Sequence, residues 1–193
     1  MIDLWHGGRR WAGRPEVQPP RKGRCECGPG IYLTNQYARA RNTYARGNGV
    51  TTLVSLKDDI SWLERKTLPL HVILDYVRHT RGFRKRDRVL EQLDESIERL
   101  NSETIPASYL VNLCVDNDVL NGSQGVSLAA FLVEQGVDAS LHTVNLEEQW
   151  VIVFNPAIIA CYRAVPAAEV SLDQYTMPLT KLPELRVDAG QNP

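Results

Sequence analysis

Long apolar runs, internal repeats and low-complexity blocks are all missing from this chain of 193 residues. Without 18 consecutive apolar residues, the sequence offers no candidate for a membrane-spanning helix. Without a repeat, it does not predict a solenoid or a propeller. A hydrophobic content of 43% and a charged content of 23% are typical of a globular protein. At this length the sequence predicts a single domain over residues 1–193.

Cysteine is scarce, and its spacing argues against a disulfide within the C-x-C pair and against a metal site. The four cysteines are Cys25, Cys27, Cys114 and Cys161. The C-x-C pair is too short for an easy mutual disulfide, and no second pair follows at metal-ligand spacing, so we predict free thiols and no metal site. No apolar signal segment precedes Arg9. We therefore expect a cytoplasmic protein with no membrane partner.

Two common nucleotide-binding motifs are also missing. The chain has no GxxxxGK[ST] loop, and no GxGxxG turn follows a predicted strand. The turn at residues 28–30 reads Gly-Pro-Gly and does not fit the second motif. These absences exclude a P-loop and a classical dinucleotide-binding turn.

The net charge of −1 conceals an uneven distribution. Residues 1–50 contain nine Lys and Arg against three acidic residues, a formal charge of +6, which leaves about −7 for the remainder. The cations are Arg9, Arg10, Arg14, Arg21, Lys22, Arg24, Arg39, Arg41 and Arg46. Such a region attracts the pyrophosphate of a dinucleotide or a nucleic acid. One dinucleotide needs only one or two of these cations.

The hydrophobic pattern predicts a mixture of strands and helices. Strands are expected at 2–6, 31–33, 50–56, 137–144, 149–154 and 158–165, and helices at 36–46, from 58, at 71–81, 87–100 and 128–135, with a short helix or turn at 106–118. Asn35 and Ser127 are expected to cap two of the helices. This order predicts an α+β architecture with an inserted helical region at about 58–120 and a frayed tail at about 180–193.

Three segments contain residues suited to one kind of ligand. They read LWHGG at 4–8, GPGIYLT at 28–34 and EEQWVIVFNP at 147–156. An imidazole can bind a hydroxyl, a bare glycine backbone can bind an amide, and tyrosine rings can stack on a flat heteroaromatic ring. Together these groups suit such a ring attached to a ribose.

In this order the three segments resemble the ADP-ribosyltransferase superfamily, in its diphtheria-toxin and poly(ADP-ribose)-polymerase-like branch. The resemblance covers about residues 2–56 and 127–160 and leaves the helical region unexplained. It implies a split, strongly bent β core with an NAD cleft between its halves. In that branch a His, Tyr, Glu triad holds NAD, which is the co-substrate.

The first two triad positions correspond to His6 and Tyr32. By resemblance, His6 binds a ribose hydroxyl of NAD and the backbone of Gly7 binds the carboxamide. Gly8 stands where the family usually has a small hydroxyl residue, so one ribose contact is missing. Tyr32 is expected to stack on the nicotinamide ring.

A second aromatic residue usually follows the stacking tyrosine by about eleven residues and closes the sandwich. Tyr44 lies twelve residues after Tyr32 and is the first candidate; Tyr37 is the second.

The third triad position corresponds to Gln149 in place of Glu. A glutamine can bond a ribose hydroxyl but carries no charge. Glu147 ranks second, because strand alternation would place it on the face of Gln149, and Glu148 ranks third, because it would point the other way. Glu147 also suits a contact with the acceptor, as a polar residue two positions before the catalytic one does in other branches.

The resemblance implies mono-ADP-ribosyl transfer from NAD to a macromolecule, by a bacterial or phage toxin or effector. The expected acceptor is a protein rather than a nucleic acid, and an antitoxin or immunity protein is the expected partner of such a toxin. Two alternatives remain open: NAD glycohydrolysis with water as acceptor, and a catalytically weak module that binds NAD or a partner. A tRNA phosphotransferase is a distant further alternative, because its His/Arg tetrad is not found here.

Overall fold

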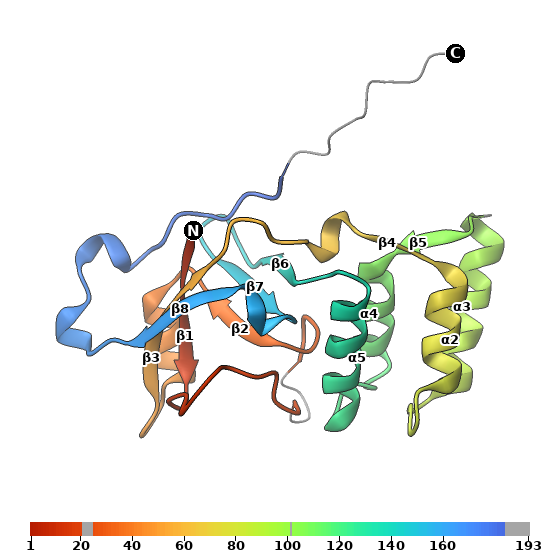
Figure 1. Ribbon diagram of the computed structural model, residues 1–193, viewed down its shortest axis with the longest axis horizontal. Helices are drawn as coiled ribbons and strands as arrows, with labels where there is room; N and C mark the ends of the chain where they lie inside the picture. The colour runs from red at the N-terminus through yellow and green to blue at the C-terminus, as the bar shows by residue number, and fades with distance from the viewer. Residues whose placement is uncertain (21–24, 101, 184–193) are drawn as a thin grey trace, which may run out of the picture.

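A computed structural model describes residues 1–20, 25–100 and 102–183 of the chain. Six antiparallel strands form its main sheet, in the order β6-β7-β2-β1-β3-β8 (Figure 1). They are β1 (Ile2–Gly8), β2 (Ile31–Thr34), β3 (Val50–Leu56), β6 (Ala139–Thr143), β7 (Gln149–Val153) and β8 (Ile159–Ala164). The predicted strands are confirmed, with ends shifted by one or two residues. The fold is α+β.

The sheet is nearly divided between β1 and β2. The strand β1 pairs with β3 along its whole length, from Ile2↔Leu56 to Gly8↔Val50. With β2 its described register consists of one pair, Trp5↔Thr34. Two three-stranded halves therefore meet at Trp5 and part beyond it, which leaves the last residues of β1 without a partner strand on that side.

Four helices lie beyond the β6 edge of the sheet. They are α2 (Leu70–His79), α3 (Arg86–Leu100), α4 (Ala107–Asp116) and α5 (Ser123–Glu134), accompanied by a small hairpin of β4 (Thr67–Pro69) and β5 (Thr104–Pro106). In Figure 1, α4 and α5 stand next to the sheet and α2 and α3 lie outside them. One hydrophobic core joins these helices to Ile152 and Phe154. The helical region is thus packed on the sheet through a shared core.

The helix predicted from Asp58 is wrong. Residues 58–62 are irregular and lead into a short 3-10 helix, η2 (Leu63–Arg65). Their hydrogen-bonding groups are used elsewhere: the amide of Ser61 donates to the Asp138 carboxylate at 3.0 Å, and Trp62 forms a bridge with Ala139. Because this stretch is held against the start of β6, it cannot wind into a helix.

Both predicted helix caps are also wrong. The last helix begins at Ser123, after Gly122, so Ser127 lies inside it. The helix after β2 begins at Tyr37 without a side-chain cap, and Asn35 binds three distant backbone groups instead. That helix starts as α1 (Tyr37–Arg39) and continues as a π-helix, η1 (Ala40–Tyr44).

After β8 the chain returns across the sheet. We call residues 167–183 the C-terminal segment; it includes the 3-10 helices η4 (Ala167–Glu169) and η5 (Leu172–Gln174). Thr180, at the start of the predicted frayed tail, is buried. Residues 184–193 of that tail lie outside the described residues, as do Arg21, Lys22 and Arg24. Over the described residues, no helix combines the length and the apolar character needed to cross a membrane.

Candidate functional site

His6 is held as a neutral imidazole at the point where the two halves of the sheet part. Its Nδ1 lies 3.0 Å from the main-chain oxygen of Tyr32. A carbonyl oxygen only accepts, so Nδ1 carries the proton and Nε2 presents a lone pair. Burial lowers the pKa of His6 below its ordinary value, which favours the same neutral form. His6 is therefore prepared to accept a hydrogen bond from a hydroxyl.

The two glycines after His6 allow close approaches. A Cβ on Gly7 would lie 2.0 Å from the oxygen of Ala40 and 2.9 Å from Cβ of Tyr44. Only glycine therefore lets η1 rest on β1 at this point. A Cβ on Gly8 would lie 2.8 Å from His6 Nε2. A larger residue at position 8 would crowd the nitrogen that carries the lone pair.

Tyr32 is fixed at its hydroxyl by two hydrogen bonds. Its hydroxyl donates to the oxygen of Gly28 at 2.7 Å and accepts from the amide of Cys27 at 3.2 Å. Gly28 has a φ of 103°, a left-handed conformation that the turn requires and that glycine tolerates. Burial raises the pKa of Tyr32 further above its ordinary value. The phenol therefore stays neutral, and what Tyr32 offers a ligand is a rigid ring.

The π-helix brings Tyr44 to the same place. The amide of Ala45 donates to the oxygen of Ala40 at 2.9 Å, an i→i+5 bond. Such a turn takes in one residue more than an α-helical turn. Tyr44 is the last residue of this π-helix and lies twelve residues after Tyr32. Tyr37 is buried instead against Trp5, with ring centroids 5.0 Å apart.

These side chains meet in one narrow cleft of about 50 Å³. Its lining residues are Trp5, His6, Gly7, Tyr32, Leu33, Thr34, Tyr44 and Trp150. Four of the sequence-predicted site residues are among them: His6, Gly7, Tyr32 and Tyr44. The cleft opens at the division between β1 and β2, where a split core was expected to hold its ligand.

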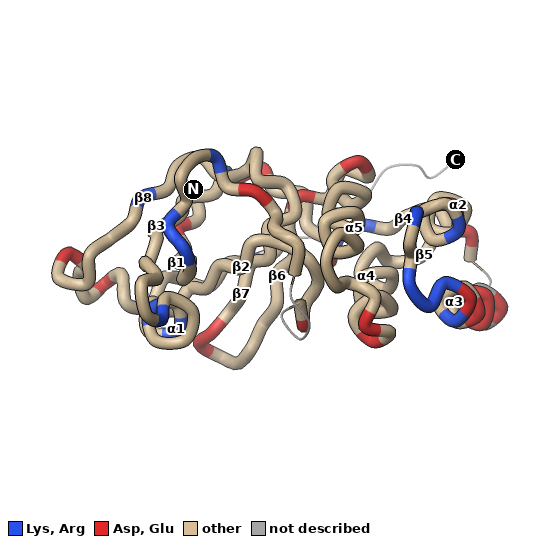
Figure 2. The backbone as a smooth tube through the Cα atoms, turned by 90° about the horizontal axis from the view of Figure 1, so that it is seen from below, with Lys and Arg blue, Asp and Glu red and all other residues tan. Residues whose placement is uncertain are grey.

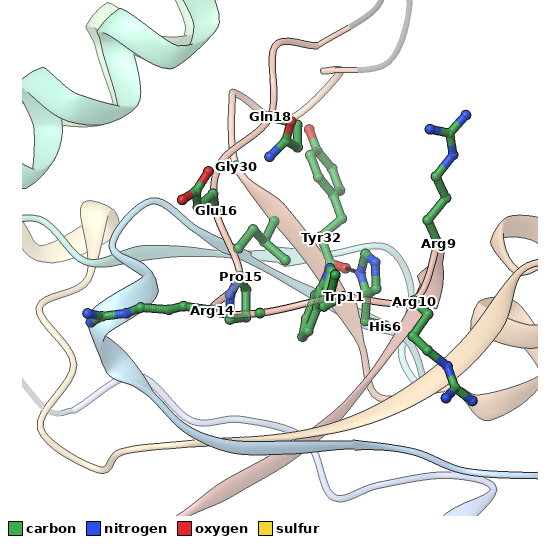
Figure 3. A pocket seen from close by; sticks show the side chains of 13 residues that line it. His6, Arg9, Arg10, Trp11, Arg14, Pro15, Glu16, Gln18, Gly30 and Tyr32 are labelled. Atoms are coloured by element: carbon green, nitrogen blue, oxygen red, sulfur yellow. Dashed lines mark hydrogen bonds between the residues drawn. The ribbon is translucent and has the colours of Figure 1, made fainter.

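A larger cavity of about 480 Å³, here called the arginine cavity, shares His6 and Tyr32 with the narrow cleft. Arg9, Arg10, Arg14, Glu16 and Gln18 also line it (Figure 3). The ring of Trp11 stacks on His6, with centroids 4.7 Å apart and an angle of 27° between the planes. The loop that carries Trp11 is anchored further on, where the Tyr162 hydroxyl donates to the oxygen of Gly13 at 2.7 Å.

Gln149 does not reach the narrow cleft. The residue is only 8% exposed, and its Oε1 accepts a hydrogen bond from the amide of Thr180 at 2.8 Å. Along β7 the side chains alternate, and the cleft is lined by the next residue, Trp150. The backbone of Gln149 is held by Asn35, whose Oδ1 accepts its amide at 2.9 Å. Gln149 thus connects β7 to the C-terminal segment.

Glu147 is exposed and lies in the turn before β7. The expectation that it shares a strand face with Gln149 is wrong, because the strand begins only at residue 149. Its main-chain oxygen accepts from Asn35 Nδ2 at 2.9 Å and from Gln36 Nε2 at 2.8 Å. The structure therefore uses the backbone of Glu147 and leaves its carboxylate in solvent.

Glu148 is the carboxylate that sequence ranking placed last and that the structure buries. Arg39 binds it through two hydrogen bonds, Nε to Oε1 at 2.8 Å and Nη2 to Oε2 at 2.9 Å. The indole Nε1 of Trp150 donates to the same Oε1 at 2.8 Å. The hydrogen bonds from Arg39 lower the pKa of Glu148. No sequence signal marks this pair, since its members lie 109 positions apart.

Comparison with protein-family models, with curated proteins and with solved structures finds no match to this chain. Among the described residues no group of three or more His, Cys, Asp or Glu side chains gathers as metal ligands would. The site is therefore characterised by its own geometry: a neutral imidazole, an unpaired strand edge, two tyrosine rings and an adjoining arginine-lined cavity.

Proposed function

We propose that this protein is an NAD-dependent mono-ADP-ribosyltransferase that holds nicotinamide in the narrow cleft. The observation that carries the proposal is the convergence of His6, Gly7, Tyr32 and Tyr44, from three elements, on that single cleft. The sequence resemblance selects the same four residues without any knowledge of their positions in space. Their meeting beside the basic arginine cavity is what an NAD site requires.

Each part of the cleft matches one part of the nicotinamide riboside. The rings of Tyr32 and Tyr44 would stack on the flat pyridine ring. The edge of β1 at Gly7 is not paired with β2, so its backbone can bind the carboxamide. The lone pair of His6 Nε2 would accept from a ribose hydroxyl.

The arginine cavity would take the other end of NAD. Three arginines and one glutamate line it, a formal charge of +2 that balances the two negative charges of a pyrophosphate. Its volume of about 480 Å³ lies within the usual range for small-molecule sites. Because His6 and Tyr32 belong to both cavities, a single dinucleotide can pass from one to the other.

In the reaction the bond between ribose C1′ and nicotinamide nitrogen breaks, and its electron pair leaves with neutral nicotinamide. A lone pair of the acceptor then forms a bond to C1′, and the proton of that group passes to water. The ribose is oxocarbenium-like in between, so a nearby negative charge lowers the barrier.

The buried carboxylate of Glu148 is connected to the narrow cleft through Trp150, whose indole lines the cleft and donates a hydrogen bond to Glu148. We assign it the electrostatic role that the sequence resemblance gives to position 149. Because Arg39 shares the charge of Glu148, the stabilisation is smaller than that from an unpaired carboxylate. We therefore expect slow transfer of single ADP-ribose units.

The test is incubation of the purified protein with labelled NAD and a bacterial lysate, following nicotinamide release and label on macromolecules. His6→Ala and Tyr32→Ala should each lose at least 90% of the labelling, or about tenfold in rate. The matched control is His79→Ala, which changes an exposed histidine on α2. Full labelling by both site variants would overturn the proposal, and nicotinamide release without label would make the protein an NAD glycohydrolase.

A second candidate function is NAD binding without turnover. The specific observation in its favour is that both polar side chains at the start of β7 are engaged, Gln149 with Thr180 and Glu148 with Arg39. Calorimetric NAD binding that is lost in Tyr32→Ala, with no nicotinamide released by the wild type, would establish this function instead.

A further inference from the structure

A third cavity shares Arg10 with the arginine cavity. This rim cavity, of about 250 Å³, is formed where β1 ends, β3 begins and β8 ends. His6 pairs with Thr52, and Thr52 pairs with Ala164 of β8, so these residues form one row across the sheet. Neighbouring strands are about 4.8 Å apart. The rim cavity is therefore about 10 Å from His6.

The rim cavity is positively charged. Arg10 and Arg41 line it, and no carboxylate is among its described lining residues. The described residues include no ion-pair partner for either arginine. Arg41 uses one donor to bind the oxygen of Ala45 at 3.3 Å, which leaves the rest of its guanidinium for a ligand. Two guanidinium groups with no carboxylate between them select an anion, and their planar forks suit phosphate.

NAD does not account for Arg41. Arg10 also lines the arginine cavity, where it belongs to the three arginines that balance the two phosphates, but Arg41 does not line that cavity. Figure 3 shows the side chains of Arg9 and Arg10 leaving the end of β1 in different directions. Figure 2 places Lys and Arg around α1, next to this end of the sheet, and a separate basic group at the start of α3. Arg41 is thus a cation in excess of what the co-substrate needs.

We propose that the rim cavity is the acceptor subsite and that it binds a backbone phosphate of a single-stranded nucleic acid. This inference rests on the proposed function. A strand held there would pass Tyr162, which lies on β8 two residues before Ala164 and is 36% exposed, and such rings are stacking platforms for bases. An acidic peptide would match the charge but would make no use of this ring. A base nitrogen or hydroxyl of the strand would supply the lone pair that attacks ribose C1′ and would release its proton to water.

The first test is binding of fluorescein-labelled 20-nucleotide single-stranded RNA and DNA without NAD, at 50 and 200 mM KCl. Arg41→Gln should weaken binding about fivefold and reduce the salt dependence by about one counterion. Ala167→Asp should weaken it similarly, because it adds a carboxylate at an exposed position of the rim cavity without removing any contact. Ala168→Asp, its exposed neighbour outside the cavity, and Arg88→Gln on α3 are matched controls that should change binding less than twofold.

The second test separates this proposal from the first one. With labelled NAD and lysate, nuclease should remove the labelled product, and Ala167→Asp should lower labelling more than it lowers NAD affinity measured by calorimetry. Label that survives nuclease and disappears with protease would overturn the nucleic-acid acceptor while leaving the transferase intact. Equal weakening by Ala168→Asp, stronger binding of a phosphopeptide, or no nucleic-acid binding at 50 mM KCl would also overturn it. Absence of NAD binding would instead overturn the proposal that the protein is an ADP-ribosyltransferase.

Discussion

His6 and Tyr32 are joined by a single hydrogen bond of 3.0 Å from Nδ1 to a main-chain oxygen, across the line where the sheet divides. The bond connects β1 to β2 beyond their one paired position and fixes the tautomer of the imidazole. The same bond that closes the gap between the halves therefore also orients the lone pair of Nε2. This dual role makes the protonation of His6 a direct test of the site.

NAD binding should weaken in mild acid. Because burial lowers the pKa of His6 below its ordinary value of about 6.5, the imidazole is neutral at pH 7 and above. Affinity measured by calorimetry should be constant from pH 8 to 7 and fall as the pH drops through this lowered pKa. The stability contribution of neutral His6 follows the same direction: it is present above about 6.5 and is lost below. A loss of affinity that begins above pH 7 would contradict this assignment.

Gly7→Ala should separate η1 from β1. The added methyl group would collide with the main chain of Ala40, which cannot move away by rotating a side chain. We expect a loss of about 1–3 kcal/mol in the free energy of unfolding, with weaker NAD binding. Urea denaturation monitors the first effect and calorimetry the second.

Gly13→Ala is the matched control, because no atom lies within 4 Å of the position that its new methyl group would take and the loop is exposed. It should change stability by less than about 0.5 kcal/mol. Equal effects of the two substitutions would contradict the close approach between η1 and β1.

Glu148→Gln should make stability less dependent on pH. The carboxylate has a lowered pKa, so its contribution is present above the unfolded value of about 4.5 and disappears as the pH falls through the folded value. Since the side chain of Arg39 is 39% exposed, we expect a difference of only about 1–2 kcal/mol between wild type and variant at pH 7. Urea titrations at pH 7 and pH 3.5 should show this difference shrinking in acid.

The same variant should reduce nicotinamide release more than NAD affinity, because the charge matters in the transition state and not in binding. Unchanged release would remove Glu148 from the electrostatic role and leave it as a support for Trp150.

Gln149→Ala should loosen the C-terminal segment. It leaves the buried amide of Thr180 without its acceptor, which costs about 1–3 kcal/mol. Hydrogen exchange should report faster exchange at residues 174–180 than in the wild type. Glu147→Ala, an exposed neighbour, should leave these residues unchanged. A loss of NAD affinity without faster exchange would contradict this structural role and would indicate that Gln149 acts in the cleft.

The residues of the candidate site that depend on local pattern could be predicted from the sequence, in that four of them line one cleft. The strands are visible as apolar runs, and His6, Gly7 and Tyr32 lie at the ends or centres of such runs with turn residues beside them. Tyr44, a candidate by its distance from Tyr32, also lines the narrow cleft, although the π-helix that carries it leaves no clear mark in ARNTY. The local sequence pattern was thus enough to predict the cleft residues that β1, β2 and η1 contribute.

The local sequence pattern was not enough to predict which residue at the start of β7 faces the cleft. Which of three consecutive polar residues faces the cleft depends on where the strand begins, and a shift of one residue reverses every side chain. That start is set by Asn35, which binds the backbone of both Glu147 and Gln149. Asparagine is a residue type that often caps helices, so the sequence predicted a cap at Asn35. Only the packing of distant segments shows that its side chain instead binds the backbone at the start of β7.

Trp5 and Gln174 are 169 positions apart, yet the indole of one donates to the oxygen of the other at 2.8 Å. The bonds to Tyr175, Met177 and Thr180 follow in order along the C-terminal segment and connect it to the elements around the cleft. On the ribosome, β1 must therefore wait until the C-terminal segment has been synthesised before these bonds can form. A nascent chain that stops before Gln174 has the residues of the cleft without the hydrogen bonds that connect them to the C-terminal segment.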